Sequence, residues 1–136
     1  MDSLAIQLAL HGALVLTVSI LGGLFLYRAI LNNKKEAAWH LLHAGGSVRG
    51  VMLIALAAII HLPDLPLWQL SILAWLMIFF TWTSVLAMLI AAASGERGLR
   101  YNGSNANKLV YVLYGVGTIA IFPACLLLIY GLFKVL

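Results

Sequence analysis

The residues of this chain that could do chemistry are few, and two of them are histidines close together. His40 and His43 are three residues apart, so on a helix both side chains lie on the same side. A neutral imidazole is a common ligand of metals and of haem iron, but two histidines alone make an incomplete zinc site. One imidazole is enough to hold a haem. A histidine satisfied by structural hydrogen bonds is the more frequent explanation, so both interpretations stay open at this point.

Arg49 is the second unusual residue, because it places a charge inside an apolar stretch. It lies 13 residues after Glu36, which on a helix is about 20 Å and reaches the middle of a bilayer. A charge at that depth costs at least a few kcal/mol unless it faces the protein interior, so Arg49 is a candidate functional residue. The alternative is an arginine that hydrogen-bonds backbone carbonyl groups or water.

Two further patterns could shape a pocket. Gly46 and Gly50 form a pair of small residues four positions apart, which lets a second helix or a flat macrocycle approach the backbone. Helix packing is the commoner cause of such a pair. Trp68, Trp75 and Trp82 recur every seven residues, so they share a helix face. That face either lines an aromatic pocket or serves packing and anchoring at the membrane interface.

Apolar helices must position these residues. The chain has 136 residues, of which 64% are hydrophobic and 9% charged, and its mean hydropathy is +1.07. Soluble domains carry about 25% charged residues, so the composition excludes an ordinary soluble enzyme. Four apolar segments cover residues 4–31, 36–60, 65–94 and 107–135 approximately, each long enough to span a bilayer. Since backbone groups in lipid must be satisfied within the segment, we predict a single all-α domain, an integral membrane up-and-down four-helix bundle.

The cations gather at one end of the predicted bundle. The first and third connections and the adjoining segment ends hold Arg28, Lys34, Lys35, Arg97, Arg100 and Lys108, whereas the other end holds only Lys134. The positive-inside rule therefore places these two connections in the cytoplasm and both termini outside, and we expect a bacterial inner membrane. Cations in clusters at segment ends favour this topology over nucleic acid binding.

Several short motifs, taken together at their separations, resemble the membrane-bound styrene oxide isomerases. They are Trp39-x-x-x-His43, Gly50-Val-Met-Leu-Ile, Trp82 and Arg97-Gly98-Leu99, and the chain's His11-Gly12 resembles the His-Gly opening of that family. The resemblance covers most of the chain and is weakest in the last segment. It implies a homotrimer of four-helix protomers with haem b near the subunit interfaces.

The same resemblance implies roles for particular residues and a reaction. His43 falls on the axial iron ligand, and Trp39, Gly46, Gly50 and Arg97 are expected beside the haem. In the family, ferric iron acts as a Lewis acid on the epoxide oxygen, the benzylic C–O bond opens, and a 1,2-hydride shift gives an aryl acetaldehyde. An apolar pocket would keep water from the cation, and the rings of Trp75 or Trp82 could stabilise it. We therefore predict an isomerase that acts on a lipophilic aryl epoxide.

Three polar positions of the family pattern differ here. Arg49 stands where the family has an asparagine six residues after the axial histidine, Phe80 replaces an aspartate two residues before the later tryptophan, and Met88 replaces a tyrosine six residues after it. In one interpretation Arg49 becomes the polar group, holding a carboxylate-bearing ligand, a haem propionate or the developing oxyanion, while Phe80 and Met88 enlarge an apolar pocket. In a second, catalysis is lost and the protein binds haem for sensing, transfer or electron exchange. A structural membrane subunit without a cofactor is the third hypothesis.

Overall fold

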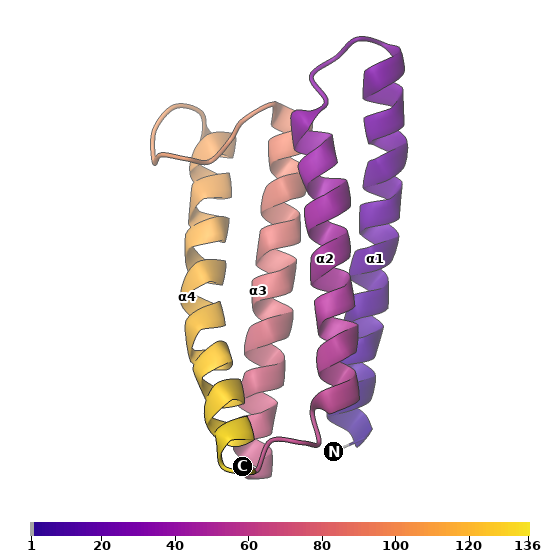
Figure 1. The fold of residues 1–136 in the computed structure, drawn as a ribbon. Coiled ribbons are helices and arrows are strands. Elements are labelled where there is room, and N and C mark those ends of the chain that lie inside the picture. Colours follow the sequence, from indigo (N-terminus) through magenta and orange to yellow (C-terminus); the bar gives the residue numbers. More distant parts are fainter. Residues whose placement is uncertain (1) are drawn as a thin grey trace.

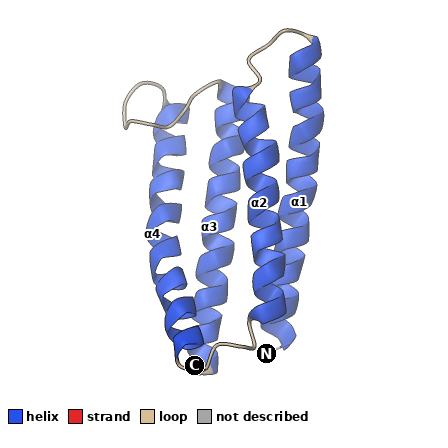
Figure 2. Cartoon of the chain, viewed as in Figure 1, coloured by secondary structure: helices blue, strands red, loops and turns tan. Residues whose placement is uncertain are grey.

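The computed structural model describes residues 2–136 and consists of four long antiparallel helices (Figures 1 and 2). They are α1 (Asp2–Leu31), α2 (Ala37–Ile59), α3 (Leu67–Ser94) and α4 (Asn105–Phe133). Each end lies within about two residues of the end expected from the apolar runs, because a helix in lipid continues until polar residues stop it. The predicted all-α class is confirmed.

All four helices are long and apolar enough to cross a membrane. Large apolar side chains are more than half exposed along their outer faces, among them Ile6, Leu24, Val48, Ile119 and Phe122. Exposed apolar surface on this scale is unfavourable in water but compatible with lipid chains. The protein is therefore an integral membrane protein.

The helices follow one another across the molecule in chain order, as Figure 1 shows. α1 packs along α2 and also approaches α3, whereas α4 packs against α3 alone. The arrangement is thus up-and-down, as predicted, but open beside α4. An apolar core that includes Leu8, Leu53, Leu73 and Ala124, one from each helix, fills the half of the bundle nearer the termini.

The first and third connections lie at the same end of the bundle, opposite both termini (Figure 1). The third connection is held by Asn107, at the start of α4, whose side chain is buried. Its Oδ1 accepts a hydrogen bond from the Gly98 N–H at 2.8 Å, and its Nδ2 donates to the backbone oxygens of Arg100 and Asn102, both at 2.8 Å. Gly98 has a φ of 64° and lies against Val110, where a side chain would not fit.

A polar contact closes the opposite end. Nζ of Lys134 lies 2.8 Å from the Asp64 carboxylate and donates to the Asp64 backbone oxygen at 2.9 Å. The hydrogen bond to the Asp64 side chain raises the pKa of Lys134. Both side chains are well exposed, so the pair contributes little to stability and mainly ties the C-terminus to the turn between α2 and α3.

Candidate functional site

His43 lies on the side of α2 that packs against α1. Its Nδ1 is 2.9 Å from the backbone oxygen of Ser19 on α1. A carbonyl oxygen only accepts hydrogen bonds, so Nδ1 carries the proton and donates, and Nε2 keeps its lone pair. Gly23 makes this approach possible, because a Cβ at that position would lie 2.8 Å from Nδ1 of His43. His43 is therefore fixed through Nδ1, and Nε2 is left free. Metal-ligating histidines are usually fixed in this way, through the ring nitrogen that does not bind the metal.

The other residues predicted beside a haem on α2 lie along the same seam with α1. Trp39 stacks on Phe25, with ring centroids 4.9 Å apart and planes at 23°. Gly46 lies against the side chain of Ser19, and a Cβ at Gly50 would be 2.9 Å from the Gly12 backbone oxygen. Both glycines are buried under α1. The structure thus shows a helix-packing role for both glycines, and their place beside a haem stays a prediction.

Arg49 lies on a different side of α2 from His43. Six residues separate the two, which is about 120° around the helix. Nη1 of Arg49 donates to the Gly45 backbone oxygen at 3.0 Å, and the guanidinium carbon is 5.4 Å from the centroid of the Phe80 ring. A Cβ at Gly45 would lie 3.1 Å from Cε of Met88 and 3.3 Å from Nη1 of Arg49. Arg49, Phe80 and Met88, the three departures from the family pattern, therefore form one cluster between α2 and α3.

The surroundings of Arg49 leave its charge without a partner. The side chain is partly buried, and its Nε is inaccessible and makes no hydrogen bond. Tyr114 of α4 packs against the apolar cluster that contains Met88, the neighbour of Arg49 beside Gly45. Among the side chains that the structure describes, no carboxylate pairs with Arg49, and the ion pair formed is that of Lys134 with Asp64. Phe80 supplies a cation–π contact instead.

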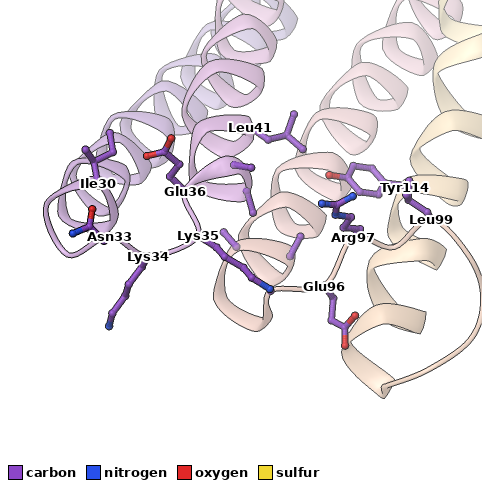
Figure 3. Close-up of a pocket in the computed structure, with 15 residues that line it drawn as sticks. Ile30, Asn33, Lys34, Lys35, Glu36, Leu41, Glu96, Arg97, Leu99 and Tyr114 are labelled. Atoms are coloured by element: carbon purple, nitrogen blue, oxygen red, sulfur yellow. The ribbon is translucent and has the colours of Figure 1, made fainter.

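A cavity of about 880 Å³ opens at the end of the bundle that carries the first and third connections (Figure 3). Leu41 of α2, Ala91 of α3 and Tyr114 of α4 line its walls. Its polar rim consists of Asn33, Lys34, Lys35, Glu36, Glu96 and Arg97. Arg97, predicted to meet the cofactor, thus lies at the rim of the cavity, whereas His43 does not line it.

Trp82 meets a partner that the sequence analysis missed. Its Nε1 donates to Nδ1 of His11 on α1 at 3.0 Å. The rings of Trp75 and Trp82 both lie edge-on to the His11 imidazole, at centroid distances of 6.2 and 6.3 Å. The two tryptophans share a face, as the seven-residue spacing indicates, while Trp68 is 62% exposed at the end of α3. In the sequence, Trp82 stood out by the seven-residue spacing and His11 by the His-Gly motif, but neither pattern paired the two residues.

Comparison with known proteins identifies the family. The family model described as styrene oxide isomerase matches residues 4–133, which is nearly the whole chain. A search of curated proteins gives no match. The matched region contains all four helices almost completely, together with His43, Trp82 and the Arg97-Gly98-Leu99 motif. The chain therefore belongs to the styrene oxide isomerase family.

Proposed function

We propose that this protein isomerises a lipophilic epoxide to an aldehyde or ketone, with haem b bound through Nε2 of His43. The observation that carries the proposal is the 2.9 Å hydrogen bond between His43 Nδ1 and the Ser19 backbone oxygen. It fixes the tautomer whose free lone pair is on Nε2, which would suit a ligand of the haem iron. Membership of the family supports the reaction class.

The haem, when bound, would supply a Lewis acid that polarises the epoxide oxygen. The chain's own part is to hold that group through His43, to orient the substrate and to keep water away from the carbocation that ring opening creates. The hydride moves from one carbon of the substrate to its neighbour. The reaction therefore consumes no external oxidant or reductant.

The first experiment is the absorption spectrum of the purified protein, oxidised and then reduced. We expect a Soret band in the wild type that is lost in His43→Ala. His40→Ala is the matched control, because His40 is exposed and lies one helical turn away. A wild type without a Soret band after expression with ample haem overturns the proposal.

The activity test uses styrene oxide and a bulkier aryl epoxide with the haem-loaded protein. Conversion to the carbonyl compound should exceed that of free haem in the same detergent and should fall when the haem is reduced, because ferrous iron is the weaker Lewis acid. Turnover equal to that of free haem contradicts an epoxide isomerase.

A non-catalytic haem protein is the second candidate function. The clustering of Arg49, Phe80 and Met88 favours it, because one compact region carries all three replacements. It predicts the Soret band and its loss in His43→Ala, without turnover of any epoxide above that of free haem. The two experiments above therefore separate the two functions.

Assembly and orientation form part of the same proposal. We expect a homotrimer in the bilayer, with the first and third connections in the cytoplasm and both termini outside. The cationic side chains at that end, such as Lys34, Arg97 and Arg100, support the orientation. Native mass spectrometry measures the subunit number, and trypsin added to sealed inverted vesicles tests whether the third connection is on the cytoplasmic side.

A further inference from the structure

The charge of Arg49 has no counter-ion in the part of the chain that the structure describes. Glu36 and Glu96 lie at the end of the bundle with the first and third connections, and Asp64 is paired with Lys134 at the other end. Glu36 is 13 residues before Arg49, about 20 Å along α2. A charge left unpaired in a low-dielectric region is costly, so the site is complementary to an anion.

The Arg49 side chain extends along α2 toward the end of the bundle that carries the cavity, whose lining does not include Arg49 itself. Its Nη1 bonds the carbonyl oxygen of Gly45, which is one turn nearer to the cavity end of α2. Gly45 leaves the space for this, because a Cβ there would lie 3.3 Å from Nη1. Tyr114 connects the two regions, since it lines the cavity and also packs against the apolar cluster that contains Met88, which lies with Arg49 beside Gly45. In Figure 3 the hydroxyl group of Tyr114 points toward α2, the helix that carries Leu41.

The cavity itself suits an amphiphilic anion. The helices give it an apolar wall that includes Leu41, Ala91 and Ala92. Its rim carries three cations, Lys34, Lys35 and Arg97, against the two carboxylates of Glu36 and Glu96. The excess of positive charge at the rim and the positive charge of Arg49 both attract an anion.

We propose that Arg49 binds the carboxylate of a lipophilic ligand whose apolar body lies in the cavity, so that Arg49 selects carboxylate-bearing molecules. The guanidinium has five N–H donors, of which the bond to Gly45 uses one and the inaccessible Nε carries another. The remaining donors match a carboxylate better than a neutral group. A lipid phosphate at the membrane surface would lie about 20 Å away, too far to serve. The binding of a carboxylate by Arg49 does not depend on the proposed function.

Binding is tested without any turnover, on the full-length protein in detergent. Isothermal titration compares 4-phenylbutyrate with 4-phenylbutyramide, which has the same body and no charge. We expect the wild type without haem to bind the acid at least about tenfold more tightly, a factor typical of one charge-assisted contact. Equal affinity for acid and amide in the wild type overturns the proposal.

Two variants and a control assign the preference to Arg49. Arg49→Gln should abolish it, and Arg49→Lys, which keeps the charge, should retain part of it. Arg28→Gln is the matched control, because Arg28 is an exposed cation at the end of α1. Thermal unfolding shows that each variant is folded. An acid preference that survives in folded Arg49→Gln overturns the proposal.

A haem propionate is the other possible source of the carboxylate, and haem-loaded protein distinguishes the two. Retention of the acid preference after loading supports a separate ligand. If haem displaces 4-phenylbutyrate and Arg49→Gln loses haem, the carboxylate that pairs with Arg49 is a haem propionate. That result overturns the proposal of a separate carboxylate ligand. The acid preference in haem-free protein does not depend on the Soret band or on turnover of styrene oxide, so this proposal and the proposed function fail separately.

Discussion

Nε1 of Trp82 on α3 donates a hydrogen bond to Nδ1 of His11 on α1, 3.0 Å away and 71 residues apart in the chain. The bond joins two helices that are not neighbours in sequence. Inside a membrane no water is present to replace a lost partner. The bond therefore fixes how α1 is rotated against α3.

Replacing Trp82 by Phe tests the contribution of this bond. The variant keeps an aromatic ring and loses the donor, so we expect a loss of about 0.5–1.5 kcal/mol in stability. Thermal unfolding of Trp82→Phe, His11→Leu and the double variant gives the coupling energy. Trp68→Phe, at an exposed position, is the control. Additive effects of the two changes would show that the bond contributes nothing.

Gly23→Ala tests the positioning of His43. The new Cβ would lie 2.8 Å from Nδ1 of His43 and would push the imidazole away from the Ser19 oxygen. On the proposed function, haem content should fall several-fold, read from the ratio of Soret to protein absorbance. Gly115→Ala is the matched control, because position 115 has no neighbouring atom within 4 Å. Equal haem content in the two variants would mean that Gly23 does not position the ligand.

The four spans and the common end of the two cationic connections could be predicted from the sequence, because lipid imposes a length and a polarity rule on every segment. The place of Arg49 along its helix, 13 residues after Glu36, followed from the same count. The partners of these residues could not be predicted, because they depend on how each helix is rotated against the next. Periodicity gave Trp75 and Trp82 a shared face but could not choose His11 as the residue opposite.

The clustering of Arg49, Phe80 and Met88 is a second example. They come from two helices that are joined by a turn, and only the packing of α2 on α3 brings them together. The neighbour of Gly46 and Gly50 could not be predicted either. Their spacing in the sequence was compatible with the close approach of a second helix or of a flat macrocycle. The identity of the neighbour, α1, is a property of the assembled bundle.

Asn107→Ala tests how the third connection is held. The change removes the side-chain hydrogen bonds to Gly98, Arg100 and Asn102, so we expect a loss of about 1–3 kcal/mol and a looser connection. Limited trypsin digestion in detergent should then cut after Arg100 faster than in the wild type. Asn105→Ala, an exposed asparagine two residues earlier, is the control. The same cleavage rate in both variants would show that Asn107 does not restrain this connection.

Gly50→Ala tests the close packing of α1 on α2. The added Cβ would lie 2.9 Å from the Gly12 backbone oxygen and 2.7 Å from Cγ of Leu16. A backbone oxygen cannot move aside unless α1 moves with it, so we expect a loss of about 1–3 kcal/mol. Gly115→Ala introduces the same methyl group into open space and should gain up to about 1 kcal/mol in helix propensity. Thermal unfolding of haem-free protein compares the two variants independently of any cofactor. Equal stability of the two variants would mean that α1 can move away from α2 at low cost. The contact between α1 and α2 that holds His43 would then not be rigid.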